Sequence, residues 1–286
     1  METSPFAWMR IGHWTDERAK TGCTVIAFDA PVVASGEVRG GAPASREFAL
    51  LEPTKLVESI HAVCLSGGSA FGLAASDGVM QKLRADQIGF ATKHAVVPIV
   101  VGLSLYDLGV GDSDAYPDAA AGSAALDAAT SEFAVGQIGA GTGATVGKWR
   151  GAAHTRPGGL GFASVSRDDV TVCALIAVNA VGDIDTSGTV PAAIADGTFE
   201  WPDIESPLRE NTTIGVIATN AALTKSQCRS VAEAGHDGLA RAIVPAHTPA
   251  DGDALVVVSH PEHEADLATV RTLSAVAVEA AIASTA

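Results

Sequence analysis

The sequence of 286 residues has few aromatic residues, few basic residues and no closely spaced cysteine pair. Lysine and arginine number 18 against 33 aspartate and glutamate residues, which gives a formal net charge of −15 at pH 7. Nucleic acids and anionic membranes bind basic patches, so this charge argues against both as partners. Cys23, Cys64, Cys173 and Cys228 are scattered without a CxxC motif, and we expect buried free thiols.

Long apolar runs are also missing from the sequence. None approaches the roughly 18 residues that a membrane-spanning helix needs. Residues 1–5 lack the basic and apolar segments of a secretory signal peptide. These two absences lead us to expect a cytoplasmic protein with no membrane partner.

Hydrophobic residues, by contrast, make up 47% of the chain, against 18% charged residues, as in a folded globular protein. No repeat, low-complexity tract or domain boundary is visible, so we expect a single domain over residues 1–286. β-branched and apolar runs predict strands at 22–28, 31–39, 60–65, 96–105, 161–166, 170–179, 213–219 and 254–259. Helices are predicted at 70–83, 119–129, 224–243 and 264–284.

Two connecting segments have distinctive compositions. Residues 66–69 join a strand to a helix through Gly67 and Gly68, as in a phosphate-binding turn, but GxxxxGK[ST] and GxGxxG are both absent. Close packing of the helix on the sheet is the alternative explanation for these glycines. Residues 190–209 contain three prolines and little apolar periodicity, which predicts a surface linker.

That linker leads to a junction where a polar loop ends at Asn211 and a β-branched run begins at Thr212. If the bond between them were cut, Thr212 would become N-terminal. Its hydroxyl would be a nucleophile, and its α-amine, with a pKa of about 7.7–8.0, a nearby base. Turn chemistry followed by a strand explains the same two residues without catalysis.

Two polar residues outside this junction are further candidates. Asn179 ends an apolar strand, where a turn or capping role and an oxyanion-donor role are both open. Lys148 follows the glycine-rich segment 136–147. It is either an anion donor or a solvated surface side chain.

Two other classes of function remain open from the residues alone. His247, Asp251, Asp253, His260 and His263 crowd one region, which allows a metal-dependent amidohydrolase or aminopeptidase. No HExxH motif is present, and the spacing fits no familiar zinc site. A non-catalytic ligand-binding protein that uses the glycine turn for an anion is the third alternative.

Six separated stretches nevertheless resemble one family, in order along nearly the whole chain. They are VRGGAP at 38–43, LSGGSAFGL at 65–73, VPIV at 97–100, GAGTG at 139–143, NTTI at 211–214 and HTPADGD at 247–253. Together they resemble the L-aminopeptidase/D-esterase family of N-terminal-nucleophile hydrolases. This family includes β-peptidyl aminopeptidases, a pantetheine hydrolase and the 6-aminohexanoate-oligomer (nylon-oligomer) hydrolases.

The resemblance implies an α/β fold, a four-layer αββα sandwich, made as one precursor that cleaves itself before a Ser or Thr. In this chain the cut falls between Asn211 and Thr212, which leaves an α chain of residues 1–211 and a β chain of residues 212–286. No metal or organic cofactor is implied. The family's habit of forming tetramers implies a homotetramer of αβ units.

The resemblance also implies roles for individual residues. Thr212 matches the nucleophile and Asn179 the oxyanion-hole asparagine. Lys148 and Tyr106 match a lysine and a tyrosine that line the site of the nylon-oligomer hydrolases. Asp251 and Asp253 match an acidic pair there, whereas the β-peptidyl branch has Ser-x-Glu.

The implied activity is hydrolysis of amide, and also of ester, bonds in small amino-acid-derived substrates or ω-amino-acid oligomers. A net charge of −15 suits a substrate that carries an ammonium group. Asp251 and Asp253 lie two residues apart and would point to one side of an extended stretch. We therefore expect them to act together near the Thr212 amine.

Overall fold

The computed structural model describes residues 1–201 and 211–286. The main strands are β2 (Met9–Asp16), β3 (Thr21–Val38), β4 (Ala44–Arg46), β5 (Ser59–Ser66), β8 (Val100–Ser104), β12 (Gly159–Arg167), β13 (Val170–Asn179), β15 (Thr212–Ala221) and β17 (Ala254–His263). Short two-stranded pairs are β1 (Glu2–Thr3) with β9 (Glu132–Phe133), β6 (Phe90–Ala91) with β7 (Val96–Val97), β10 (Thr145–Val146) with β11 (Arg156–Pro157), and β14 (Asp183–Ile184) with β16 (Ile243–Val244). The α-helices are α1 (Ser69–Gly72), α2 (Ala75–Ala85), α3 (Ala119–Asp127), α4 (Thr189–Asp196), α5 (Lys225–Ala242) and α6 (Leu267–Ala283). The 3₁₀ turns are η1 (Phe48–Leu51), η2 (Gly139–Gly141), η3 (Lys148–Arg150) and η4 (Ala152–His154).

The long strand β3 connects two halves of one nine-stranded sheet. The strand order is β12-β13-β15-β17-β3-β5-β8-β4, with β2 also paired to β3. The end of β3 pairs with β17, and its beginning pairs with β2 and β5. The register with β5 shifts between Ala27 and Val32, so the strand is irregular where the halves meet. A bulge of this kind bends a strand, which lets one sheet supply two packed layers.

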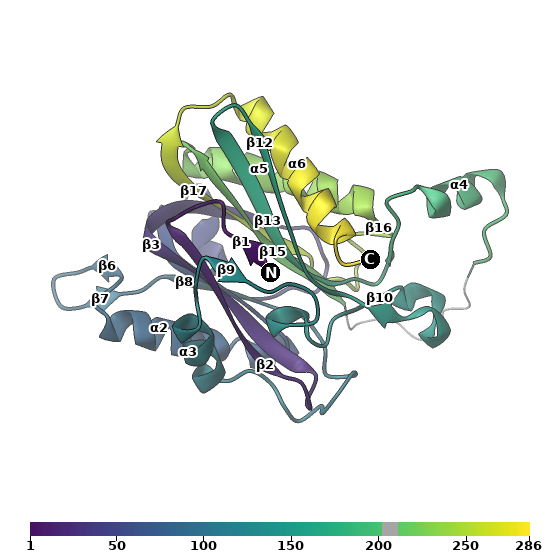
Figure 1. The fold of residues 1–286 in the computed structure, drawn as a ribbon, viewed down its shortest axis with the longest axis horizontal. Helices are drawn as coiled ribbons and strands as arrows, with labels where there is room; N and C mark the ends of the chain where they lie inside the picture. The colour runs from purple at the N-terminus through teal and green to yellow at the C-terminus, as the bar shows by residue number, and fades with distance from the viewer. Residues whose placement is uncertain (202–210) are drawn as a thin grey trace.

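These two halves pack face to face, and helices cover both outer faces (Figure 1). One apolar cluster fills the space between the halves, with Leu65 and Leu103 from one and Leu175 and Val216 from the other. A second cluster joins β13, β15 and β17 to α5 and α6, and a third joins β3, β5 and β8 to α2 and α3. The resulting layers are α, β, β and α, as the resemblance implied.

The alternation of side chains along the central strands explains this layering. In β15, Ile214 and Val216 enter the cluster between the halves, whereas Ile217 enters the cluster under α5 and α6. In β17, Val256 enters the cluster between the halves, and Leu255 enters the cluster under α5 and α6. Successive side chains of a strand point to opposite faces, so a strand that is buried on both faces is apolar throughout.

Several predicted elements are confirmed, and others differ in detail; the strands predicted at 22–28 and 31–39, for example, are one strand, β3. The hairpin of β12 and β13 turns at residues 167–170, and Thr224 and Gln227 form the predicted capping box before α5. The predicted helix at 70–83 is split into α1 and α2, and the predicted strand at 96–105 into β7 and β8. The predicted linker 190–209 begins in α4, where a proline in the first turn is tolerated, and its residues 202–209 lie outside the described residues.

Two expectations from composition can be compared with the structure. Cys23, Cys64, Cys173 and Cys228 are free and buried, as expected. Within residues 1–201 and 211–286, no helix is long and apolar enough to cross a membrane.

Candidate active site

Three strand ends meet at one edge of the sheet and bring the predicted residues together. Asn179, the last residue of β13, is the register partner of Thr212, the first residue of β15. β15 runs parallel to β17, and Asn211 forms a parallel bridge with Asp251, just before β17. Residues from three distant parts of the sequence therefore become neighbours at this edge.

The peptide carbonyl of Asn211 receives two hydrogen bonds. The Thr212 hydroxyl donates to its oxygen, and the backbone N–H of Gly252 donates to the same oxygen at 3.0 Å. Thr212 is 4% exposed, so both contacts are shielded from water. A hydroxyl and a fixed N–H donor thus converge on one carbonyl group.

Residue 252 must be glycine because the surrounding atoms leave no room for a side chain. A Cβ atom on residue 252 would lie 2.7 Å from the Thr212 Oγ1 atom and 2.7 Å from the carbonyl oxygen of Ala42. Real Cβ atoms essentially never make contacts under 3.0 Å. Only glycine therefore lets the backbone approach the Thr212 hydroxyl this closely.

The Asn211 side chain is buried, and the described part of the chain gives it no hydrogen-bond partner. The residue is 2% exposed, and neither Oδ1 nor Nδ2 has a partner among the described residues. Leaving a buried polar group unpaired costs about 1–3 kcal/mol. The residues that the structure describes offer the Asn211 amide group no hydrogen bond.

Asn179 gathers two other predicted residues, Lys148 and Tyr106. The Lys148 ammonium donates to Asn179 Oδ1 at 2.8 Å, and the backbone N–H of Thr145 donates to the same oxygen at 2.9 Å. Asn179 Nδ2 donates to the backbone carbonyl of Tyr106 at 2.8 Å. Lys148 is therefore held against Asn179 and is not merely a solvated surface side chain. One of the two Nδ2 hydrogens of Asn179 is engaged by Tyr106.

The Asp251 carboxylate stabilises the loop that precedes β17. Its Oδ1 accepts from the Val181 N–H at 3.1 Å. Its Oδ2 accepts from the Thr248 N–H at 3.1 Å and from the Thr248 hydroxyl at 2.6 Å. Burial raises the pKa of Asp251, and the nearby charge of Asp253 raises it further, although these hydrogen bonds oppose both effects.

The Asp253 carboxylate lies next to the chain at Thr212. Its Oδ1 accepts from the N–H of Thr213 at 2.8 Å. Its Oδ2 lies 3.2 Å from the backbone N of His247 and 2.9 Å from His247 Nδ1. Asp253 is 2% exposed, so it anchors the residue that follows Thr212 in a dry environment.

Sequence analysis assigns no role to Gly252 and considers His247 only as a metal ligand. In the sequence, Gly252 is only the glycine of an Asp-Gly turn. Its contact with Asn211 joins residues far apart in the chain, which no local pattern predicts. His247 was a candidate metal ligand, and the structure pairs it with Asp253 instead. The sequence shows His247 only six residues before Asp253, and this spacing is the one feature that could have predicted their contact.

The residues considered for a metal site do not form one. His260 packs on Trp8, with ring centroids 5.1 Å apart, and His263 pairs with Ala221 at the far end of β15. In the part of the chain that the structure describes, no three His, Cys, Asp or Glu residues are grouped to hold a metal ion. The metallohydrolase alternative therefore has no ligand set in these residues.

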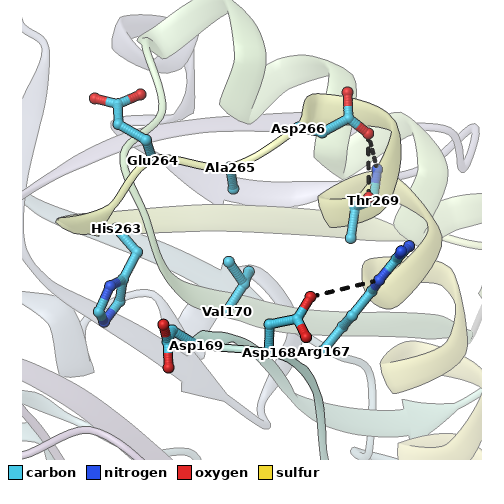
Figure 2. Close-up of a pocket in the computed structure, with 9 residues that line it drawn as sticks. All are labelled: Arg167, Asp168, Asp169, Val170, His263, Glu264, Ala265, Asp266 and Thr269. Carbon is cyan, nitrogen blue, oxygen red and sulfur yellow. Dashed lines mark hydrogen bonds and ion pairs between the residues drawn. The ribbon is translucent and has the colours of Figure 1, made fainter.

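A polar pocket of about 380 Å³ lies away from this edge, where β12 turns into β13 and β17 ends (Figure 2). Asp168, Asp169, His263 and Asp266 are among its lining residues. Strand β15 separates this end from Thr212 by its full length, because Ala221 pairs with His263 and Thr212 pairs with Asn179. The pocket is therefore distinct from the candidate active site.

Comparison with known sequences places this chain in a family. The model of peptidase family S58 matches residues 7–286. An uncharacterized aminopeptidase of Mycobacterium bovis is 40% identical over 278 residues, which cover 88% of this chain and 79% of the relative. A 6-aminohexanoate-oligomer endohydrolase of Agromyces sp. is 33% identical over 275 residues, with 90% of this chain and 74% of the relative covered.

Comparison with solved structures supports the fold. A β-aminopeptidase from Burkholderia sp. superposes with a TM-score of 0.76 at 20% identity, covering 100% of this chain and 88% of the other. The L-aminopeptidase D-Ala-esterase/amidase of Ochrobactrum anthropi, described as a variant of the N-terminal-nucleophile hydrolase fold, gives 0.76 at 19% identity, with 99% and 86% covered. These similarities concern the fold, and the sequence matches define the family. The chain therefore belongs to peptidase family S58, has the N-terminal-nucleophile hydrolase fold, and is a hydrolase of amide bonds.

Proposed function

We propose that the chain cleaves itself between Asn211 and Thr212, and that Thr212 then serves as the N-terminal nucleophile of an aminopeptidase or amidase. The observation that carries this proposal is the contact of the Thr212 hydroxyl with the carbonyl oxygen of Asn211. The Gly252 N–H on the same oxygen supports it, because acyl transfer needs a donor where negative charge develops.

Self-cleavage proceeds as an acyl shift from nitrogen to oxygen. The Thr212 hydroxyl oxygen attacks the carbonyl carbon of Asn211, and the Gly252 N–H stabilises the oxyanion. The bond between the carbonyl carbon and the Thr212 nitrogen then breaks. The hydroxyl proton ends on that nitrogen, and an ester joins Asn211 to the Thr212 side chain. Water hydrolyses the ester, which frees the Asn211 carboxylate and the Thr212 amine.

Two features of the folded chain favour this reaction. The Asp253 carboxylate holds the Thr213 N–H at 2.8 Å, which limits movement of the strand at the nucleophile. The Gly252 N–H holds the Asn211 carbonyl oxygen at 3.0 Å, so the scissile carbonyl is held in place beside the Thr212 hydroxyl.

The cleaved enzyme applies the same chemistry to a substrate. The free amine of Thr212 acts as the base for its own hydroxyl, because its ordinary pKa lies near neutral pH. The second Nδ2 hydrogen of Asn179 stabilises the oxyanion of the substrate. Lys148 keeps the Asn179 amide in this orientation through its hydrogen bond to Oδ1. The backbone carbonyl of Tyr106 holds the other Nδ2 hydrogen, and we place the Tyr106 side chain in the lining of the substrate site.

The proposed substrates are small amides with a free amine, including ω-amino-acid oligomers. The 6-aminohexanoate-oligomer endohydrolase among the relatives and the net charge of −15 both support this class. The Asp-x-Asp form at residues 251–253, which resembles that of the nylon-oligomer hydrolases, supports it further. The mature enzyme is proposed to be a homotetramer of αβ units that needs no metal or organic cofactor.

A pair of matched variants tests the nucleophile. Thr212→Val and Thr213→Val each remove one hydroxyl with little change of shape. The Thr213 hydroxyl has no hydrogen-bond partner among the described residues, so its loss breaks no contact there. We expect Thr213→Val to be cleaved and active, and Thr212→Val to remain a single inactive chain. Cleavage of Thr212→Val at the same bond would exclude Thr212 as the nucleophile.

The substrate class requires a separate assay. Amino-acid p-nitroanilides and 6-aminohexanoate oligomers are compared side by side with the cleaved protein. Hydrolysis of either supports an amidase for amine-bearing substrates. If the cleaved protein hydrolyses neither, the proposed substrate class is wrong.

A further inference from the structure

His247 has a backbone conformation that side chains rarely adopt. Its φ is 54°, in the left-handed region, and its side chain is 16% exposed. Both its backbone N and its ring Nδ1 face the same Asp253 oxygen, at 3.2 and 2.9 Å. Non-glycine residues in this region persist where surrounding contacts hold them, often at functional sites.

The other side of the His247 ring rests on helix α5. Its Nε2 lies 3.4 Å from the backbone oxygen of His236, and the two rings pack edge to face with centroids 4.8 Å apart. His236 is buried, and its Nε2 lies 3.0 Å from the backbone oxygen of Glu37. Burial lowers the pKa of His236 to about 3, so this ring stays neutral. It packs against the His247 ring and limits the movement of that ring.

A continuous set of contacts joins this ring to the nucleophile. His247 Nδ1 meets one Asp253 oxygen, and the other Asp253 oxygen accepts from the N–H of Thr213, the residue after Thr212. A carboxylate with both oxygens engaged has one fixed orientation, and the Thr213 peptide is fixed with it.

We propose that His247 is a positioning residue for Asp253, and that its Nδ1–H thereby sets the geometry at Thr212 for self-cleavage. The inference rests on the proposed function, since it names a residue that supports the same reaction. It also predicts which ring nitrogen donates to Asp253. The Asp253 oxygen that faces Nδ1 already accepts from the backbone N–H of His247, so Nδ1 acts as a second donor to that oxygen.

Three substitutions separate the ring's hydrogen bond from the strain of the backbone. His247→Asn keeps a donor close to the place of Nδ1 and tolerates a left-handed backbone. His247→Gly relieves the same strain but has no donor, and His247→Ala has neither advantage. Fragment formation is followed in time after cell-free synthesis, with His94→Asn, an exposed histidine, as the control.

We expect the Gly and Ala variants to form fragments about tenfold to a hundredfold more slowly than the wild-type chain. His247→Asn should recover most of the rate, and His94→Asn should match the wild type. Thermal melting of each variant in the Thr212→Val background separates slow cleavage from unfolding. Wild-type rates in His247→Gly, or no recovery in a folded His247→Asn, would overturn the inference.

A second measurement does not depend on substitutions at His247. In ¹⁵N-labelled Thr212→Val protein, the imidazole nitrogen shifts of His247 should show a proton on Nδ1 at neutral pH. An unprotonated Nδ1 would overturn the inference. Failure of the proposed function has a different sign: the wild-type chain would be active without being cleaved, whatever the His247 variants do.

Discussion

The backbone N–H of Gly252 donates to the carbonyl oxygen of Asn211 at 3.0 Å. This contact joins the turn before β17 to the residue before β15, and the Thr212 hydroxyl donates to the same oxygen. Attack by that hydroxyl would place negative charge on an oxygen that already has a fixed donor. An interaction of this kind needs no reorganisation during reaction.

Gly252→Ala should slow self-cleavage by a hundredfold or more in a folded chain, on the order of 10²–10³. The added Cβ would come within 2.7 Å of the Thr212 Oγ1 atom and would displace either the nucleophile or the N–H donor. Loss of one oxyanion donor slows acyl transfer by about 10²–10³. The measurement is fragment formation over time, with circular dichroism to verify the fold. Wild-type cleavage in this variant would show that the contact has no catalytic role.

Asn179→Asp should separate self-cleavage from substrate turnover. The substitution keeps the oxygen that accepts from Lys148 and Thr145 but removes the Nδ2 donor. Since Gly252 supplies the donor for the Asn211 carbonyl, fragments should still form. Turnover of a small amide should fall by about 10²–10³, because the oxyanion of the substrate loses its donor. A folded Asn179→Asp chain that stays uncut would show that one donor serves both reactions.

Asp253→Asn should slow maturation and amide hydrolysis by about 10²–10⁴, as for a positioned group at the reacting centre. Its new NH₂ would face an N–H donor, either that of Thr213 or that of His247. Asp251→Asn should be milder, because Asp251 contacts Val181 and Thr248, which are further from the nucleophile. Near-normal cleavage and turnover in the Asp251→Asn/Asp253→Asn double variant would show that the two carboxylates have only a structural role in the turn.

The acidic pair also predicts how stability depends on pH. Burial, and then the charge of Asp253, raise the pKa of Asp251 above its unfolded value of about 3.9. The folded chain therefore binds the Asp251 proton more tightly than the unfolded chain does. The resulting stabilisation is fully present below about pH 3.9 and is lost as pH rises through the folded pKa.

Urea unfolding of Thr212→Val, with and without Asp251→Asn, measures this contribution at pH values from about 4 to 7, starting near the unfolded pKa. The difference in unfolding free energy between the two chains should shrink as pH rises, because the charged carboxylate is disfavoured in the fold. A difference that grows with pH would mean that the hydrogen bonds from Val181 and Thr248 outweigh burial.

The sequence predicted those parts of the fold that depend on local patterns. The apolar run at Thr212–Ala221 is a buried strand, and the capping box at Thr224 begins α5. The linker prediction failed at Thr189–Asp196, because a short helix of eight residues shows little periodicity. The bend in β3 is also invisible in the sequence, since it depends on how two sheet halves pack.

The candidate site was predicted in its residue types but not in its contacts. Asn179, Lys148 and Tyr106 lie in direct contact in the structure. Asp251 and Asp253 do lie close together, but their oxygens accept from backbone N–H groups that no local pattern identifies. The partners of Asp253, for example, are Thr213 and a histidine whose left-handed backbone turns its ring toward the carboxylate.

Self-cleavage at Thr212 is the central claim, and intact mass under denaturing conditions tests it most directly. The 28.9 kDa chain should give fragments of about 21 and 8 kDa, the smaller beginning at Thr212. Amide hydrolysis should appear together with these fragments during maturation. A fully active enzyme that remains one chain of 286 residues would contradict the account.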